Sequence, residues 1–325
     1  MRQVKFLDMK KYPVIIFCVL VVFAIFFGFC SSSSSNNTEV VVSDEDGEIE
    51  LVTQVDYFTS PHIPSIVEFA GEALPLHLFD VRESFERELL VNMNFHSNTL
   101  QYLKRVARFF PVIEPILAAN GIHDDFKYLA LIESDFMHRV SPAGATGFWQ
   151  FMRPAAAEYG LEMNSEIDER YHLEKATVAA CRYLRDSYRS FGNWTMVAAS
   201  YNMGRAGLNT QVNRQKSNNY YDLLLNEETS RYIFRIAAVK LILTNPQQYG
   251  FFVPEDEKYQ PIPYTEVEVK EGVANWVDFA FQHNTNYKIL RILNPWLRDI
   301  KLTNSARKTY IVKIPAEGFR EVQNL

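Results

Sequence analysis

The segment "YLALIESDFMHRVSPAGATGFWQFM", residues 128–152, decides which fold we expect for this chain. It opens with an apolar helical run and places a carboxylate, Glu133, at the end of that run. A loop of Ser, Pro, Gly and Ala follows and leads into Phe148, Trp149 and Phe151. The apolar residues before Glu133 predict that its carboxyl is partly desolvated, which would raise its pKa and suit a general acid.

The residues alone leave the role of Glu133 open. A solvated or ion-paired carboxylate at a helix end is the other interpretation. If the chain cleaves a glycosidic bond with two carboxylates, Glu133 needs a second carboxylate close to it. Asp135 is two residues away from Glu133, and two residues at that spacing do not lie on the same face of a helix. Asp168 and Glu169 are followed by Arg170, which indicates a structural ion pair. No convincing second carboxylate emerges.

Length and apolar spacing predict a mainly α protein with one helical domain and a small module. The chain has 325 residues, of which 47% are apolar, enough for one substantial core and a smaller unit. Apolar residues recur at helical spacing through residues 86–250, with Pro111 predicted to open a helix and Gly121, Gly192 and Asn245 to end helices. The pattern of residues 262–316 predicts a strand, two short helices and a returning strand.

Residues 1–30 are predicted to be an export signal or anchor. A basic start precedes 17 apolar residues from Val14 to Cys30, and a Ser-rich tract follows. Gly28 suits a lipoprotein signal ending at Cys30, whereas Phe29 is bulky for that pattern. Lipid attachment at Cys30, an uncleaved anchor and a cleaved signal peptide all stay open. Each places the remainder outside the cytoplasm, where residues 31–85 would form a linker and wrapping segment.

Charge and cysteine content narrow the function further. The chain has 33 basic and 39 acidic residues, a net charge of −6. Because residues 1–30 hold four basic residues and one acidic residue, residues 31–325 carry 29 basic and 38 acidic ones, a net charge of −9. This acidity argues against nucleic acid as a partner. Cys181 is the remaining cysteine and is predicted to be buried, and the histidines form no metal-binding motif, so no metal and no cofactor is predicted.

A series of short motifs follows Glu133 along the chain. The motifs are Glu133-Ser134, Phe136, Ser141, Gly144-Ala145, Gly147, Gln150-Phe151-Met152, "YGL" at 159–161, "DER" at 168–170, "YL" at 183–184, "FGNW" at 191–194, "SYNMG" at 200–204 and "ETSRYI" at 228–233. Their order and spacing resemble those of the lytic murein transglycosylases, and within them the membrane-bound type D group with its goose-lysozyme-like fold. The resemblance implies a lysozyme-like helical catalytic domain and a single-carboxylate mechanism.

The resemblance also implies roles for individual residues. The residue matching Glu133 protonates the leaving glycosidic oxygen and then assists the 6-hydroxyl of N-acetylmuramic acid in attacking its own anomeric carbon. Products would end in 1,6-anhydro-N-acetylmuramic acid, and no water would be consumed. Tyr201 and Asn202 match residues that orient the sugar and the acid, and Tyr232 is expected to face the acid.

Other matched residues have two possible roles. Ser141 and Gln150 would hydrogen-bond to the glycan, although Ser141 could instead cap a turn. Gly144 and Gly147 would let the backbone pass close to the sugar, although a flexible loop also needs glycine. Glu228 could cap its helix or touch substrate, and the cap is the favoured prediction. Trp149 and Trp194 are expected in the core more than on sugars.

The C-terminal segment resembles a divergent LysM domain, the βααβ unit that binds glycans containing N-acetylglucosamine. The resemblance rests on "YTEVEVKEGV" at 264–273, "LRILNPWL" at 290–297 and "YIVKIP" at 310–315. The alternative is a purely structural lid on the catalytic domain. The sequence therefore predicts an envelope-anchored lytic transglycosylase that binds peptidoglycan strands. Its rivals are a hydrolytic lysozyme, which would use Asp168 to activate water, and an inactive peptidoglycan-binding scaffold.

Overall fold

The computed structural model describes residues 39–43, 49–53 and 59–320. The chain divides into two compact units, residues 1–60 and residues 61–325. The predicted export segment, residues 1–30 with Cys30, lies outside the described residues. Within the described ranges, no helix is both long and apolar enough to cross a membrane.

The first unit contains a two-stranded sheet that the sequence did not predict. Strand β1 (Glu39–Ser43) pairs antiparallel with β2 (Ile49–Thr53), with Glu39 opposite Thr53 and Ser43 opposite Ile49. The segment had been expected to be a linker. Both strands are short and rich in β-branched residues, and such residues favour a strand only where a partner strand is available.

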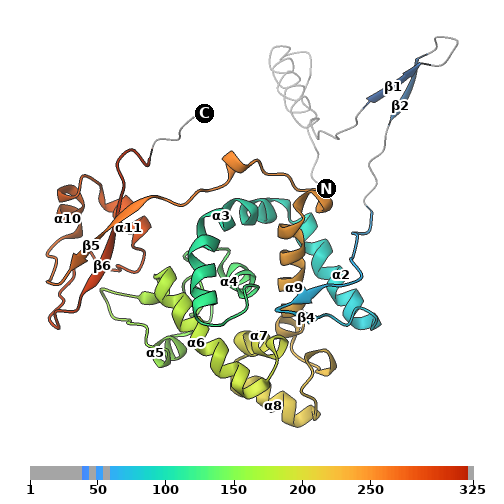
Figure 1. Ribbon diagram of the computed structural model, residues 1–325, viewed down its shortest axis with the longest axis horizontal. Coiled ribbons are helices and arrows are strands. Elements are labelled where there is room, and N and C mark those ends of the chain that lie inside the picture. Colours follow the sequence, from blue (N-terminus) through green and yellow to red (C-terminus); the bar gives the residue numbers. More distant parts are fainter. Residues whose placement is uncertain (1–38, 44–48, 54–58, 321–325) are drawn as a thin grey trace, which may run out of the picture. The chain divides into compact units, whose positions relative to one another are not determined.

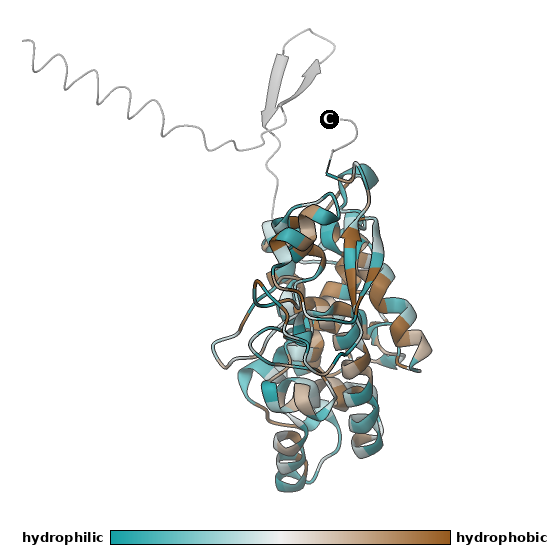
Figure 2. Cartoon of the chain, turned by 90° about the vertical axis from the view of Figure 1, so that its left-hand side faces the viewer, coloured by the Kyte–Doolittle hydropathy of each residue, from teal (hydrophilic) through white to brown (hydrophobic). Residues whose placement is uncertain are grey.

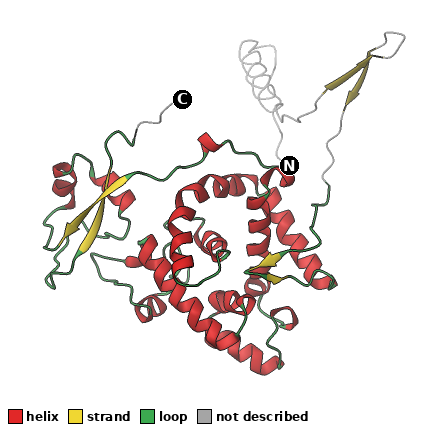
Figure 3. Ribbon diagram, in the orientation of Figure 1, coloured by secondary structure: helices red, strands yellow, loops and turns green. Residues whose placement is uncertain are grey.

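The second unit is mostly helical, as predicted. Figure 3 shows that helices make up most of this unit and that its strands form small sheets, each of two strands. The helical part begins with the hairpin of β3 (Glu68–Phe69) and β4 (Glu72–Ala73). The elements that follow are α2 (Phe79–Asn94), α3 (His96–Ala119), α4 (Phe126–Ser134), α5 (Arg153–Glu158), η2 (Glu169–Tyr171), α6 (Leu173–Phe191), α7 (Trp194–Met203), α8 (Arg205–Gln215), η3 (Tyr220–Asp222), α9 (Glu227–Thr244), η4 (Pro246–Tyr249) and η5 (Glu255–Glu257).

Helix α4 lies at the centre of the helical part. Figure 1 shows α3, α6, α7 and α9 arranged around it, and α2 against the outer side of α9. Phe126, Leu129, Ala130 and Leu131 of α4 are completely buried. A helix that is apolar on all sides must lie inside a core, so the run that precedes Glu133 fixes the acid near the middle of the domain.

The prediction that Pro111 opens a helix is wrong. Helix α3 runs continuously from His96 to Ala119 and contains both Pro111 and Pro115. A proline inside a helix removes one backbone hydrogen bond and displaces a carbonyl, which bends the helix. Figure 1 shows that α3 is bent. The fully buried Ile113 and Leu117 anchor the second half of α3 in the core, so tertiary packing offsets the cost of the prolines.

The C-terminal module has the predicted βααβ order. It consists of β5 (Tyr264–Val269), α10 (Trp276–Gln282), α11 (Tyr287–Leu293) and β6 (Tyr310–Pro315). The strands pair antiparallel, and the side chains of Asn275 and Asn286 cap the two helices. Figure 2 shows hydrophobic and hydrophilic residues side by side along these elements. Such amphipathic elements bury one face, here around Trp276 and Leu290.

The module and the helical domain share a hydrophobic core. Ile167 and Tyr171 of the helical domain belong to the same buried cluster as Trp276, Trp296 and Val312 of the module. The backbone N–H of Asp168 donates to the carbonyl oxygen of Trp296 at 2.9 Å. The module is therefore packed onto the helical domain, as expected if it serves as a structural lid. Glycan binding by the exposed surface of the module stays a prediction.

We expect replacement of Ile167 with alanine to loosen the module. Ile167 is 1% exposed, and truncating such a side chain costs about 2–5 kcal/mol. Limited proteolysis should then cut the segment between residues 250 and 263 faster than in the unmodified protein. Ile311→Ala is the matched control, because Ile311 is 38% exposed. Equal cleavage rates in both variants would show that Ile167 does not hold the module.

Candidate active site

The end of α4 positions Glu133 through its neighbours. Asp135 terminates the helix in the left-handed conformation with φ of 52°, and its N–H donates to the carbonyl oxygen of Leu131 at 2.8 Å. The hydroxyl of Ser134 donates to the carbonyl oxygen of Phe148 at 2.8 Å. The helix end is thus tied to the loop that follows, which restricts where Glu133 can point.

Glu133 is a half-buried carboxyl with one hydrogen-bond donor from α9. The hydroxyl of Tyr232 donates to Oε1 of Glu133, which confirms that Tyr232 faces the acid. The pKa of Glu133 is raised to about 7, mainly by burial and to a smaller extent by the charge of nearby Glu228. The Tyr232 hydrogen bond and the charge of Arg235 oppose this rise. The predicted raised pKa is confirmed, and the carboxyl can hold or release a proton near neutral pH.

Two tyrosines flank the acid and stay neutral. Burial and the proximity of Glu133 raise the pKa of both Tyr201 and Tyr232 well above the usual value for a phenol. The Tyr201 hydroxyl donates to the carbonyl oxygen of Trp149 at 2.7 Å. Tyr201 therefore connects α7 to the loop after α4, while Tyr232 connects α9 to the acid. Both act as hydrogen-bond donors and not as bases.

Asn202 is held in place by α9. Its Oδ1 accepts from the Thr229 hydroxyl at 2.7 Å, and its Nδ2 donates to Glu228 at 2.9 Å. The prediction that Glu228 caps α9 is wrong, because the side chain of Asn226 accepts from the N–H of Thr229 at the helix start. Glu228 is the second residue of the helix, after the capping Asn226 and Glu227. Its carboxylate is exposed and bonds to Asn202 instead.

Arg235 is a residue of the site that sequence reasoning missed. It donates to the carbonyl oxygen of Ile132 at 3.2 Å, and its charge lowers the pKa of Glu133. Glu228, Tyr232 and Arg235 are separated by four and three residues on α9, which places them on one face of the helix. That spacing was readable in the sequence and could have identified Arg235 once Tyr232 had been assigned.

Gln150 and Ser141 organise the loop between α4 and α5. The side-chain amide of Gln150 donates to the carbonyl oxygens of Gly147 at 2.8 Å and Arg139 at 3.1 Å. Its Oε1 makes no hydrogen bond within the described residues. The Ser141 hydroxyl oxygen accepts from the N–H of Ala145 at 3.0 Å, so Ser141 does cap a turn. Contact of either side chain with a glycan stays a prediction.

The structure gives Gly147 a packing role. Its φ is 83°, and a Cβ at this position would lie 1.9 Å from the carbonyl oxygen of Arg170. Only glycine allows the two backbones to approach this closely. Gly144 differs, because its φ is 88° but a Cβ there would meet nothing within 4 Å. Close passage of a sugar at Gly147 stays a prediction.

The other candidate carboxylates have structural partners. Asp168 forms a buried ion pair with Arg170 at 2.7 Å, as predicted, and Glu169 pairs with Lys175. Arg170 also donates to the carbonyl oxygens of Gly144 and Phe151, both at 3.3 Å. Asp168 therefore orients the arginine that holds the active-site loop. Asp135 accepts from the Tyr102 hydroxyl at 2.6 Å.

Trp149 lies in the core and Trp194 packs against it half-buried, in agreement with the expectation that both serve packing. Trp149 is completely buried, and its Nε1 donates to the Thr177 hydroxyl at 2.9 Å. Trp194 packs against the ring of Phe126, with 5.3 Å between ring centroids. Cys181 is completely buried, which raises the pKa of its thiol to about 12. Among the described residues, no group of three or more His, Cys, Asp or Glu side chains could hold a metal ion.

We expect Tyr232→Phe to shift the pH dependence of the reaction toward alkaline pH. The hydrogen bond from Tyr232 lowers the pKa of Glu133, so its loss leaves the pKa above about 7. A general acid must be protonated, and activity therefore falls as pH rises through this pKa. The alkaline limb of the pH–rate profile should move to higher pH in Tyr232→Phe. Tyr201→Phe is the control, because that hydroxyl bonds to a backbone carbonyl. Coincident alkaline limbs in wild type and Tyr232→Phe would contradict this role.

Comparisons with known proteins agree with this geometry. Residues 114–224 match the model of the Transglycosylase SLT domain, and residues 265–318 match the model of the Soluble lytic transglycosylase C-terminal LysM-like domain. The membrane-bound lytic murein transglycosylases D of Escherichia coli strains K12 and O6:H1 are each 28% identical over 221 residues, which is 65% of this chain. The chain spans about half the length of these curated relatives, 48% in each case. The first matched range carries Glu133, Tyr201 and Asn202, whereas Tyr232 comes from α9 beyond it.

Proposed function

We propose that this chain, which carries a transglycosylase SLT domain and a C-terminal LysM-like domain, is a peptidoglycan lytic transglycosylase. One observation supports the proposal most directly. Glu133 is a half-buried carboxyl whose pKa is raised to about 7 and whose position is fixed by Tyr232. Burial of such a group is costly for the fold, and perturbed pKa values of this kind concentrate at functional sites.

In the proposed reaction Glu133 acts first as an acid and then as a base. Its proton goes to the glycosidic oxygen between N-acetylmuramic acid and N-acetylglucosamine as the β-1,4 bond breaks. The resulting carboxylate then takes the proton of the 6-hydroxyl as that oxygen attacks the anomeric carbon. The ring closes to a 1,6-anhydro end, and the proton returns to Glu133. A pKa near the working pH allows both steps.

The partners of the nearby carboxylates favour an intramolecular nucleophile, and Glu228, whose charge acts on Glu133, is bonded to Asn202. Among the described residues, Asp168 and Asp135 are committed to Arg170 and Tyr102. A hydrolytic enzyme would need a carboxylate that activates water or attacks the sugar. In the transglycosylase reaction the substrate's own N-acetyl group can share the transient positive charge, so one carboxylate suffices.

The neighbouring polar groups would bind and orient the glycan. Tyr201 and Tyr232 are neutral donors beside the acid, and Asn202 is preorganised by Thr229 and Glu228. The unengaged oxygen of Gln150 would accept from an N-acetyl N–H. The Ser141 hydroxyl proton, which the Ala145 contact does not use, would donate to a sugar oxygen.

The proposal extends to the location of the protein. The relatives are membrane-bound by name, and residues 1–30 have the pattern of an export signal. We place the catalytic domain on the periplasmic side of the cell envelope, held by an uncleaved anchor or by a lipid on Cys30. The LysM-like module would add affinity for the same glycan strands.

Mass spectrometry of digested peptidoglycan tests the proposed reaction. The purified full chain should release muropeptides that are lighter by one water than those released by a lysozyme from the same material. Products of full hydrolytic mass would replace this proposal with a hydrolase and make Glu228 the first residue to test as the water-activating group. Release of no muropeptides would favour a binding scaffold.

A further inference from the structure

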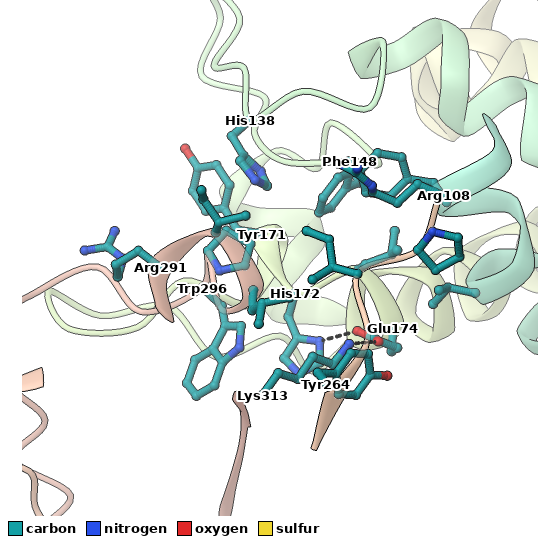
Figure 4. Close-up of a pocket in the computed structure, with 18 residues that line it drawn as sticks. Arg108, His138, Phe148, Tyr171, His172, Glu174, Tyr264, Arg291, Trp296 and Lys313 are labelled. Atoms are coloured by element: carbon teal, nitrogen blue, oxygen red, sulfur yellow. Dashed lines mark hydrogen bonds and ion pairs between the residues drawn. The ribbon is translucent and has the colours of Figure 1, made fainter. Parts of the chain in front are cut away.

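A cavity of about 440 Å³ lies between the helical domain and the C-terminal module, and the reaction proposed above does not use it. Ligand pockets in proteins commonly enclose about 300–1,000 Å³. Figure 4 shows that the catalytic domain and the module both contribute side chains to this cavity. The apolar part of the lining includes Phe109, Phe148, Tyr171, Ile262, Leu293 and Trp296.

The carboxylate of Glu174 in the lining already has partners within the protein. Glu174 pairs with Lys313 and with Nδ1 of His172, the latter at 3.1 Å, and Figure 4 marks both contacts. Burial alone would raise the pKa of Glu174, but His172 and Lys313 outweigh it and lower the pKa to about 2. Glu174 is therefore ionised, and Lys313 neutralises its charge within the protein.

The remaining charge in the lining is positive. Arg108 and Arg291 line the cavity, and neither forms an ion pair with a carboxylate of the described residues. Nε of Arg108 donates to the carbonyl oxygen of Gln260 at 3.0 Å, and its side chain reaches toward Phe148 in Figure 4. The Arg291 guanidinium points away from the cavity centre in that view. Arg108 is thus the cation best placed to meet a ligand.

The charge of Arg291, together with that of Arg298, acts on His138. The imidazole lies between the rings of Phe148 and Tyr171, with centroid distances of 5.0 and 5.7 Å. This partial burial, together with the charges of Arg298 and Arg291, lowers the pKa of His138 to about 4. A region of positive potential in a chain with a net charge of −6 favours an anionic ligand.

The active-site loop connects the cavity to Glu133. His138 and Phe148 line the cavity, and the carbonyl oxygen of Phe148 accepts from Ser134, the neighbour of Glu133. The next residue, Trp149, accepts the hydrogen bond of Tyr201. A glycan held at Glu133 would therefore lie one short loop away from the cavity.

We propose that this cavity binds the acidic peptide attached to the glycan strand, with a peptide carboxylate on Arg108 and alanine methyl groups on the apolar wall. The inference rests on the proposed function, because it assumes that peptidoglycan is the substrate. The peptides of peptidoglycan carry free carboxylates and small apolar side chains on the lactyl group of N-acetylmuramic acid. Both features match the lining, in which Arg108 forms no ion pair within the described residues and the walls are largely aromatic.

Two substrates and three variants test the cavity with the full chain. Cleavage is measured on glycan strands that carry their peptides and on strands stripped by an amidase. Wild type should cleave the peptide-bearing strands about tenfold faster, the factor expected from one charge-assisted hydrogen bond. Arg108→Gln removes the cation, and Val112→Phe narrows the cavity without changing its charge. Both variants should lose this preference for peptide-bearing strands. Both should keep the wild-type rate on stripped strands. Arg82→Gln, an exposed arginine on α2 outside the cavity, should behave like wild type.

Calorimetry with the free tetrapeptide separates the two proposals. Wild type should bind the tetrapeptide released by the amidase, and Arg108→Gln should bind it about tenfold more weakly. Cleavage without peptide preference and without peptide binding would overturn the cavity proposal and leave the transglycosylase standing. Peptide binding without cleavage of either substrate would overturn the proposed transglycosylase activity. It would leave the proposal that the cavity binds the peptide standing. Thermal unfolding of each variant shows whether Arg108→Gln and Val112→Phe remain folded.

Discussion

Replacing Glu133 with glutamine should lower the rate of glycan cleavage by about 10²- to 10⁴-fold, the contribution of a positioned general acid and base. Glutamine keeps the shape of the side chain and can still accept the hydrogen bond of Tyr232, but it cannot deliver a proton. The measurement is the initial rate of release of muropeptides from peptidoglycan, quantified by mass spectrometry. A variant that retains more than about a tenth of the rate would remove Glu133 from the reaction.

The stability of the same variant distinguishes lost chemistry from lost structure. The pKa of Glu133 is about 7 in the folded protein, against 4.5 for an unperturbed glutamate. The folded state therefore binds this proton more tightly, and stability falls as pH rises from about 4.5 to about 7. Glutamine never ionises, so Glu133→Gln should unfold at a temperature equal to or above that of wild type at pH 8. A lower unfolding temperature would mean that the activity loss reports damage to the fold.

Replacing Gly147 with alanine should destabilise the protein by about 3–5 kcal/mol, through the strained backbone and the forced separation of two segments. A Cβ at residue 147 would lie 1.9 Å from the carbonyl oxygen of Arg170, and backbone atoms cannot move aside as a flexible side chain can. Chemical denaturation measures the change. Activity should fall as well, because Gln150 bonds to the carbonyl oxygen of Gly147.

Gly144→Ala is the matched control for this effect. Gly144 also has a positive φ, of 88°, but a Cβ there would meet nothing within 4 Å. Alanine at this position should cost only the backbone strain, about 1–2 kcal/mol. If the two variants lose equal stability, the close approach to Arg170 does not govern the packing of the loop.

Most contacts among the proposed active-site residues could be anticipated from the sequence. Apolar neighbours of Glu133 predicted a raised pKa, and the Glu-Thr-x-x-Tyr spacing placed Tyr232 near the acid, which the structure confirms. The assignment of Glu228 failed because several polar residues at a helix start compete for the same backbone donors. The sequence does not show which of them, Asn226 or Glu228, wins.

The sequence by itself determined the helical domain, the βααβ order of the module, the apolar surroundings of Glu133 and the structural pairing of Asp168 with Arg170. These features depend on local periodicity and on residues close together in the chain. Only the tertiary structure decided that α3 continues through Pro111, that Gly147 contacts Arg170, and that the module closes a cavity against the catalytic domain. Each of these depends on atoms brought together from distant parts of the chain, whose packing energy overrides local preference.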